Sequence, residues 1–244
     1  MRRVANIMGI PISIDIPNCQ NPELFEMAFT RLHAIDDKFS TYKPGSALNS
    51  YRRGQAGLDK EMQRIKKACD AYEGLTNGYF SAYYNGTFDP TGYVKGWSIQ
   101  EVGDLLKARG ITTFLINAAG DIMAASSGKK TWNISLQDPF SRSKTLGAVT
   151  LTNGTIATSG TYERGQHIID PHTKKTAATL VSASVYGKEI ITADVLATAC
   201  IAMGSDKAID FMNSQDGYEA LVIDTHGFVL ASHGFGAPKT QTVL

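Results

Sequence analysis

Hydrophobic and polar residues alternate over several stretches of the chain, which is typical of half-buried β-strands. Residues 4–16 (VANIMGIPISIDI) are rich in Ile and predict one strand with a kink at Gly9–Ile10–Pro11. The other strand candidates share the alternation and read TTFLIN, DIMAAS, TWNISLQD, TLGAVTLT, TIATSG and VSASVYG. The sequence EALVIDTHGFVLAS predicts a final hairpin with its turn at His226–Gly227.

Apolar residues three and four positions apart predict helices between these strand groups. The predicted helices run over about residues 22–39, 59–74, 97–109, 192–204 and 205–213. Thr192 and Ser205 are the predicted N-caps of the last two helices, since both stand where a helical pattern begins. Residues 40–57 and 77–97 are rich in Gly and polar or aromatic residues and are predicted to be loops.

Strand clusters separated by helix pairs, without strict β-α-β alternation, predict an α+β fold. The sheets are expected to be mixed or antiparallel, with helices packed against them. No stretch reads as a linker or a low-complexity segment, so the simplest organisation is one domain over residues 1–244.

The helical segment TADVLATACIAMG carries two polar residues, Asp194 and Thr198, in an otherwise apolar run. Their spacing of four places them on one face, one turn apart. In one interpretation, Thr192 caps the helix and Asp194 complements its dipole in the first turn. In the other, the carboxylate and the hydroxyl are two oxygen ligands for one metal ion. The segment alone leaves both open.

Composition places the chain among soluble globular proteins, with 43% hydrophobic and 19% charged residues. The net charge of +1, with both signs interspersed, indicates no nucleic-acid partner. Three widely spaced cysteines exclude a disulfide framework and a thiolate zinc site. No segment has the ~20 apolar residues of a membrane span. No signal peptide is evident at the start, so a cytoplasmic location without membrane insertion is expected.

Two Gly-containing segments carry candidate chemistry. In FDPTGYVKGW, Lys95 stands among glycines that allow a backbone to approach a phosphate closely, with Asp89 upstream. An ordinary turn with an exposed lysine explains the same residues. In NAAGDIM, small residues between two strands form either a tight turn or a space for a flat ligand.

The segment TSGTYERGQHIIDPHT has the highest density of reactive groups. Thr158, Ser159 and Gly160 supply hydroxyls and open backbone after a strand. His167 is the best candidate general base among the five histidines, because an imidazole titrates near neutral pH. A histidine followed by two isoleucines is also consistent with a half-buried structural residue.

The usual local motifs of hydrolases, zinc proteases, Rossmann cofactor sites and P-loops are absent from the sequence. The remaining candidates are a Gly-rich ligand site with one lysine, one base and an Asp/Thr pair. Oxygen-only ligands favour a hard cation, Mg²⁺ or Ca²⁺. A hard cation beside phosphate-type loops indicates a nucleotide or dinucleotide substrate.

Taken in order, six segments resemble the ApbE-type FAD:protein FMN transferases. They are FSTYKPGSALN, NGYFSA, DPTGYVKGW, NAAGDI, TSGTYERGQHIIDPHT and ADVLATACIAMG. The resemblance implies an α+β fold that binds FAD and Mg²⁺. It also implies transfer of the FMN half of FAD to a Thr or Ser hydroxyl of an acceptor flavoprotein with an FMN-binding domain, releasing AMP. An FAD pyrophosphatase giving FMN and AMP, or a non-catalytic FAD-binding module, is the alternative.

Residue roles follow from the resemblance. It implies that Asp194, Thr198 and the backbone carbonyl of Gly92 bind the metal, and that His167 is the base acting on the acceptor hydroxyl. The residues that it places against FAD are Met8, Tyr42, Gly78, Tyr79, Phe80, Ser81, Asp89, Lys95, Thr158, Ser159 and Gly160.

The chain departs from the family pattern in three ways. NAAGDI has Ala119 where the usual pattern has a second Gly. The spacer between NGYF and Lys95 is shorter than usual. Many relatives are exported lipoproteins, whereas no lipobox is evident in this sequence, so the acceptor is expected on the cytoplasmic side.

Overall fold

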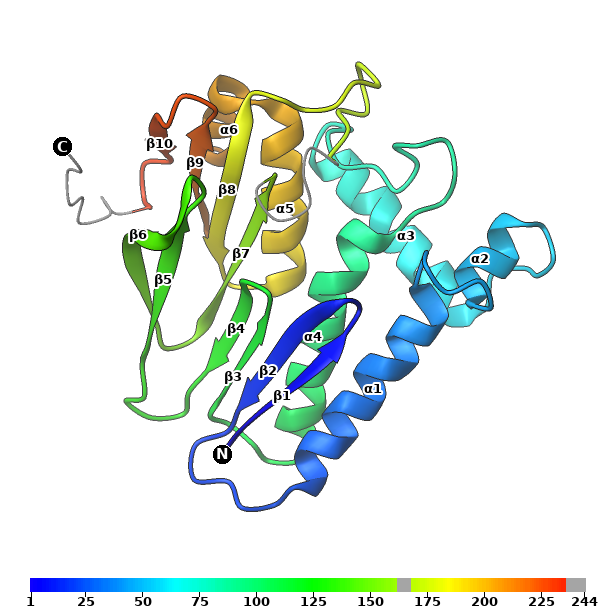
Figure 1. The fold of residues 1–244 in the computed structure, drawn as a ribbon, viewed down its shortest axis with the longest axis vertical. Helices are drawn as coiled ribbons and strands as arrows, with labels where there is room; N and C mark the ends of the chain where they lie inside the picture. Colours follow the sequence, from blue (N-terminus) through cyan, green and yellow to red (C-terminus); the bar gives the residue numbers. More distant parts are fainter. Residues whose placement is uncertain (162–167, 236–244) are drawn as a thin grey trace.

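The computed structural model describes residues 1–161 and 168–235. Eight of the described strands form one sheet in the order β1-β2-β3-β4-β7-β8-β9-β10 (Figure 1), and every neighbouring pair is antiparallel. These strands are β1 Arg2–Ile7, β2 Ile10–Asp15, β3 Phe114–Ala118, β4 Asp121–Ala125, β7 Gly154–Gly160, β8 Leu180–Gly187, β9 Tyr218–Asp224 and β10 Val229–Ala231. β5 (Trp132–Asp138) and β6 (Ser141–Leu151) form a separate two-stranded hairpin.

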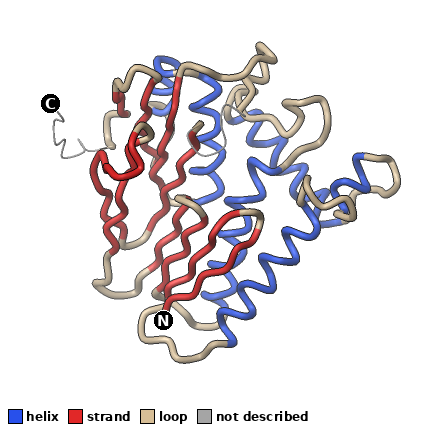
Figure 2. The backbone as a smooth tube through the Cα atoms, in the orientation of Figure 1, coloured by secondary structure: helices blue, strands red, loops and turns tan. Residues whose placement is uncertain are grey.

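The helices gather on one face of the large sheet, so that the molecule has a helical layer and a strand layer (Figure 2). They are α1 Glu23–Phe39, α2 Ala47–Arg52, α3 Lys60–Leu75, α4 Thr91–Ala108, α5 Ile190–Met203 and α6 Ser205–Met212. The predicted α+β fold is therefore confirmed, as are the helices expected near residues 22–39, 59–74 and 205–213. The extent of one domain over residues 1–244 stays a prediction. No helix within the described ranges is long and apolar enough to cross a bilayer.

Two hydrophobic cores lie on opposite faces of the sheet. The main core fills the space between the sheet and the helices and includes the fully buried side chains of Ile14 and Phe25. A smaller core lies under the β5–β6 hairpin, where Leu136 and Leu151 pack with Ile156 of β7. Because successive side chains of a strand point to opposite faces, both cores draw on the same strands.

The N-terminal segment is a hairpin, so the prediction of one kinked strand is wrong. β1 and β2 pair in register from Arg2 opposite Asp15 to Ile7 opposite Ile10. The two turn residues, Met8 and Gly9, have φ of 58° and 73°. Two successive positive φ values suit the tight turns of β-hairpins, which close the chain back on itself.

Two predicted loops contain helices. α2 lies within residues 40–57, and the Ser46 side chain caps it by accepting a hydrogen bond from the Asn49 amide at 3.1 Å. α4 begins at Thr91, so Lys95 lies on a helix and not in a loop. The Thr91 amide donates to Asp89 Oδ1 at 3.1 Å, which satisfies an N–H group at the start of that helix. The prediction that residues 40–57 and 77–97 are loops throughout is therefore wrong, because turn-forming residues precede a helix in each segment.

The caps predicted for α5 and α6 are also wrong. α5 begins at Ile190, two residues before Thr192, and α6 begins at Ser205 itself with Gly204 before it at φ 78°. The Thr192 hydroxyl lies 2.7 Å from the Tyr72 hydroxyl of α3 and does not cap its helix. Ile190 is buried in the main core, and the helix extends two residues beyond the polar signal.

The main core predicts the effect of a truncation in β2. Ile14→Ala removes a fully buried side chain and is expected to lower the free energy of unfolding by about 2–5 kcal/mol. Val4→Ala on the neighbouring strand is the matched control, because Val4 is 59% exposed. Urea unfolding of both variants measures the difference. Equal stability of the two variants would contradict the position of the core.

Candidate functional site

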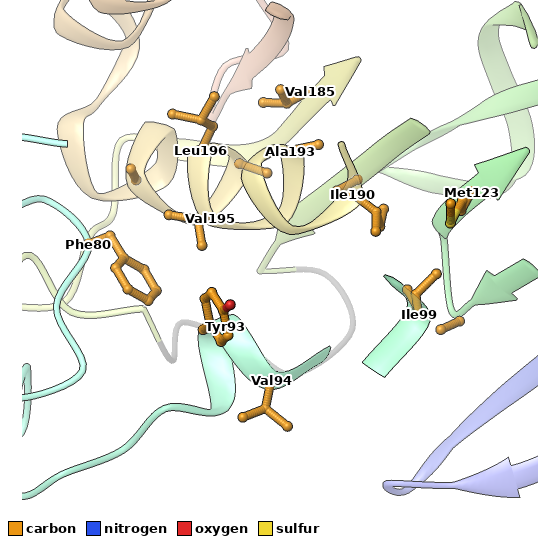
Figure 3. Close-up of a cluster of buried hydrophobic side chains, with 14 of the residues drawn as sticks. Phe80, Tyr93, Val94, Ile99, Met123, Val185, Ile190, Ala193, Val195 and Leu196 are labelled. Carbon is orange, nitrogen blue, oxygen red and sulfur yellow. The ribbon is translucent and has the colours of Figure 1, made fainter. Parts of the chain in front are cut away.

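The close approach of α4 and α5 positions the polar residues of the candidate site. The Gly96 amide of α4 donates to Asp194 Oδ2 of α5 at 2.8 Å. A Cβ on Gly96 would lie 3.0 Å from the Asp194 Cβ and 3.1 Å from the Ile190 carbonyl oxygen. A side chain at this position would therefore be tightly packed against α5, whose atoms would have to shift by a few tenths of an ångström. Figure 3 shows the apolar part of the same interface, with Val195 of α5 directed toward Tyr93 of α4.

Lys95, the residue before Gly96, is held between two carboxylates. Its ammonium lies 2.6 Å from Asp121 Oδ2 and 3.6 Å from Asp194 Oδ1. Asp121 is fully buried and Asp194 is 2% exposed. These three residues are called the lysine–carboxylate cluster below. The cluster joins α4, α5 and the start of β4, which are far apart in the sequence.

β7 supplies hydroxyls and amides beside this cluster. The Thr158 amide donates to Asp121 Oδ1 at 3.1 Å. The Ser159 and Thr198 hydroxyls lie 3.1 Å apart, which places Thr198 beside β7 and one helical turn beyond Asp194. The Thr158 hydroxyl points to the face of the sheet opposite that of Ser159, where it lies 2.8 Å from the Ser184 hydroxyl.

The electrostatics of the cluster are dominated by burial. Burial raises the pKa of Asp194 to about 7, and the negative charge of Asp121 adds to the rise, whereas Lys95 and the Gly96 amide oppose it. The lysine thus offsets part of the cost of burying two carboxylates. Such a strongly perturbed group marks a candidate functional site.

The donor set fits a hard cation whose other ligands come from a substrate or from water. Asp194 supplies a carboxylate and Thr198 a hydroxyl. In a regular helix the Gly92 carbonyl would accept from the amide of residue 96, and the Gly96 amide donates to Asp194 here. Within the described ranges, no group of three or more His, Cys, Asp or Glu side chains is placed to hold a metal. Mg²⁺ typically binds one or two carboxylates together with substrate phosphates.

Asp89 lies away from the lysine–carboxylate cluster, at the N-terminus of α4. Its Oδ2 is 3.0 Å from Nη2 of Arg52, and its Oδ1 accepts from the Thr91 hydroxyl at 2.6 Å. The Tyr84 hydroxyl donates to Asp89 at 3.2 Å. Burial and the Asp89 charge raise the pKa of Tyr84 to about 12. Asp89 thus links Arg52 and Tyr84 to the first residue of α4, Thr91.

The Gly78–Ser81 turn packs against the segment that follows residue 168. His172 Nε2 lies 3.0 Å from the Asn77 carbonyl oxygen, and its ring is in edge contact with Tyr79 at a centroid distance of 4.5 Å. Phe80 is buried in the main core, next to Tyr93 in Figure 3. Ser81 accepts a hydrogen bond from the Tyr83 amide at 3.1 Å. The Gly78–Ser81 turn and the loop that contains His172 therefore lie against each other and form one wall beside α4.

The structure does not bring all the predicted FAD contacts together. Met8 is near α4, since its sulfur lies 4.0 Å from the Ser98 hydroxyl oxygen. Tyr42 is 90% exposed. His167 lies outside the described residues; Ile168, which follows it, is buried in the main core. The role of His167 as a base stays a prediction.

Two residues of the site were missed by the sequence analysis. The sequence pattern places Asp121 only in a turn of small residues and Arg52 only in a polar loop. The signal for Asp121 was available, because a carboxylate starts an otherwise apolar strand directly after Gly120. Ala119 and Gly120 have φ of 49° and 98°, so the expected tight turn is present. No local pattern pairs Arg52 with Asp89.

The fold and site define an α+β domain with a lysine–carboxylate cluster where two helices meet a sheet. A family model described as the ApbE family matches residues 83–222, which is more than half of the chain. The chain belongs to the ApbE family.

Relatives of known name share part of the sequence. The FAD:protein FMN transferase of Treponema pallidum is 31% identical over 160 residues, covering 57% of this chain and 44% of that protein. The FAD:protein FMN transferase of Rhodobacter capsulatus is 33% identical over 124 residues, covering 47% and 24%. The chain thus spans less than half the length of these two relatives.

Solved structures share the fold over nearly the whole chain. The ApbE protein of Thermotoga maritima superposes with a TM-score of 0.83 at 22% identity, covering 96% of this chain and 97% of that one. The flavin transferase ApbE of Vibrio cholerae gives a TM-score of 0.79 at 20% identity, with 96% and 97% covered. At these identities the likeness shows the fold.

The helix contact predicts the effect of adding one methyl group. Gly96→Ala is expected to lower the free energy of unfolding by about 1–3 kcal/mol, because the new Cβ overlaps Asp194 and the Ile190 carbonyl. Gly74→Ala on α3 is the matched control, since its Cβ meets nothing within 4 Å. That control is expected to be neutral or to gain up to ~1 kcal/mol. Urea unfolding measures both, and a neutral Gly96→Ala would refute the contact.

Proposed function

We propose that this protein is an Mg²⁺-dependent FAD:protein FMN transferase. The observation that carries the proposal is the lysine–carboxylate cluster: a lysine held between two buried carboxylates, with the Thr198 hydroxyl one turn along α5. Membership of the ApbE family and the names of the relatives support the same reaction. The acceptor is a flavoprotein with an FMN-binding domain.

The reaction exchanges one phosphorus–oxygen bond for another. The hydroxyl oxygen of an acceptor Thr or Ser attacks the phosphorus on the FMN side of the FAD pyrophosphate. The bond from that phosphorus to the bridging oxygen breaks, and AMP leaves with the bridging oxygen. The hydroxyl proton passes to a base, and His167 is proposed for this role. The products are AMP and an acceptor that carries FMN through a phosphodiester.

Different residues of the chain are proposed for different parts of this reaction. Lys95 neutralises a phosphate oxygen, since its ammonium is already oriented by Asp121. Ser159 offers its hydroxyl and Gly160 its main-chain groups to the substrate from β7. Thr158, whose hydroxyl faces Ser184 and whose amide donates to Asp121, acts here through Asp121. Asp194, Thr198 and the Gly92 carbonyl would hold Mg²⁺. When bound, the ion withdraws charge from phosphate oxygens and so stabilises the transition state.

The remaining predicted contacts are proposed for the rest of FAD. Met8 lies at the β1–β2 turn near Ser98 of α4, and the Gly78–Ser81 turn forms a wall with His172. Tyr42 and Asp89 are also proposed to contact FAD, Tyr42 through an exposed aromatic ring. We propose that the protein acts in the cytoplasm.

The test is incubation of the protein with FAD, Mg²⁺ and a candidate FMN-binding acceptor domain. A mass increase of one FMN less water on the acceptor, with one AMP released per adduct, is the expected result. AMP release without an adduct would show an FAD pyrophosphatase. Bound FAD with no AMP released would show a binding module. Either of these outcomes overturns the transferase proposal.

The metal assignment predicts the effect of removing one carboxylate. Asp194→Ala is expected to abolish transfer together with its Mg²⁺ dependence, because the charged oxygen ligand is lost. Asp210→Ala on α6 is the matched control, an exposed aspartate on the next helix. AMP release is measured over a range of Mg²⁺ concentrations. Full activity in Asp194→Ala would reject the assignment.

Asp121 is predicted to position Lys95 without contacting the substrate. Asp121→Asn keeps an acceptor for the Thr158 amide but removes the charge that faces the lysine. The turnover rate is expected to fall at least about tenfold, since preorganised charge is lost from the transition state. Asp121→Glu should restore part of the rate if the charge is what matters. An unchanged rate in Asp121→Asn would remove Asp121 from the mechanism.

A further inference from the structure

The short helix α2 is anchored within the helical layer. Leu48 is fully buried in the main core. The Asn49 side chain holds the loop before α2, because its Nδ2 donates to three main-chain carbonyl oxygens of that loop. The acceptors are those of Ser40, Thr41 and Lys43, at 3.3, 3.0 and 2.9 Å. The loop also contains Tyr42, so α2 and the loop with Tyr42 form one unit.

The last residue of α2, Arg52, contacts the segment directly before α4. Its Nε donates to the Phe88 carbonyl oxygen at 2.8 Å, and its Nη2 lies 3.0 Å from Asp89 Oδ2. The Asp89 side chain is only 8% exposed and that of Arg52 only 18%. A buried ion pair typically adds little net stability compared with apolar side chains, which points to a role in fixing geometry.

Asp89 fixes the start of α4 in place of the usual capping residue. The N-cap residue, Pro90, makes no side-chain capping hydrogen bond. Asp89 Oδ1 instead accepts from the Thr91 amide at 3.1 Å and from the Thr91 hydroxyl at 2.6 Å. Asp89 Oδ2 faces Arg52 and the Tyr84 hydroxyl. One carboxylate oxygen thus holds the helix, while the other is held by Arg52 and Tyr84.

The first turn of α4 connects Asp89 with Lys95. Thr91 and Lys95 are four residues apart and lie on one face of the helix, about 6 Å apart along its axis. Between them, Gly92 packs against Phe80, since a Cβ on Gly92 would lie 3.2 Å from Phe80 Cε2. A turn that is fixed at Thr91 and packed at Gly92 therefore sets the direction from which Lys95 reaches a ligand.

We propose that Arg52 is a positioning residue for FAD. Arg52 fixes Asp89, Asp89 fixes the first turn of α4, and this turn directs Lys95 toward the pyrophosphate. Arg52 itself does not contact the substrate in this role. The inference rests on the proposed function, because that function gives Lys95 its phosphate contact. Since α2 also holds the loop with Tyr42, it connects two of the proposed FAD contacts.

The experiment measures the Kd for FAD by flavin fluorescence, without added Mg²⁺ so that turnover does not consume FAD. Arg52→Gln removes the charge that faces Asp89, whereas Arg52→Lys keeps it. Arg53→Gln is the matched control, because Arg53 is exposed and its Nε donates to Gln55 at 2.9 Å. Lys95→Gln, alone and combined with Arg52→Gln, tests whether the two residues act together.

Arg52→Gln is expected to raise the Kd for FAD about three- to thirtyfold. Arg52→Lys should raise it less, and Arg53→Gln should leave it unchanged. In the Lys95→Gln background, Arg52→Gln should have no further effect, because both residues act through one phosphate contact. A wild-type Kd in Arg52→Gln overturns the proposal. An equal fold-increase with and without Lys95 also overturns it, since this would show a general effect on the fold.

A second comparison changes the ligand and does not require the Lys95 variant to fold. Riboflavin has the flavin ring of FAD but no phosphate. Arg52→Gln should weaken the binding of FAD and leave that of riboflavin unchanged, because only the pyrophosphate meets Lys95. Equal weakening of both ligands overturns the proposal. If Arg52→Gln does not fold, Arg52→Lys is used for the same two comparisons.

The outcomes separate this proposal from the proposed function. A wild type that binds FAD without transferring FMN refutes the proposed function, and the two Kd comparisons then decide the role of Arg52. A wild type that transfers FMN, together with an unchanged Kd in Arg52→Gln, refutes only the positioning role. A wild type that binds no FAD overturns both.

Discussion

The site depends on one contact, the approach of α4 to α5 at Gly96. Without a Cβ at this position, the two helices come close enough for the Gly96 amide to donate to Asp194. The residue before it, Lys95, is thereby directed between Asp194 and Asp121. A backbone contact thus sets the geometry of three charged side chains. A side chain at position 96 would press against Asp194 itself and against the Ile190 carbonyl.

The cluster is costly to fold and useful in the folded state. Burial disfavours the ionisation of Asp194, and Lys95 and the Gly96 amide offset this only in part. An ordinary core would be filled by apolar residues at these positions. Oriented charges that need no reorganisation when a pyrophosphate binds are the corresponding gain in the proposed reaction.

Successive side chains of β7 point to opposite faces of the sheet and meet different partners. Ser159 points to the helical face and meets Thr198, whereas Thr158 points to the outer face and meets Ser184. The amide of Thr158 still contacts Asp121. One strand therefore contributes to the lysine–carboxylate cluster and to the outer face of the sheet.

The sequence by itself determined the α+β class, most strands and helices, and the placement of Asp194 and Thr198 on one helix face. These features follow from periodicity within a few residues, which local backbone geometry enforces. Only the tertiary structure decided that Lys95 lies on a helix, that Met8 and Gly9 turn a hairpin, and that Asp121 belongs to the site. Gly96 and Asp194 are 98 positions apart, and Asp121 and Thr158 are 37 apart. Contacts at such separations depend on how whole elements pack, and no local pattern records them.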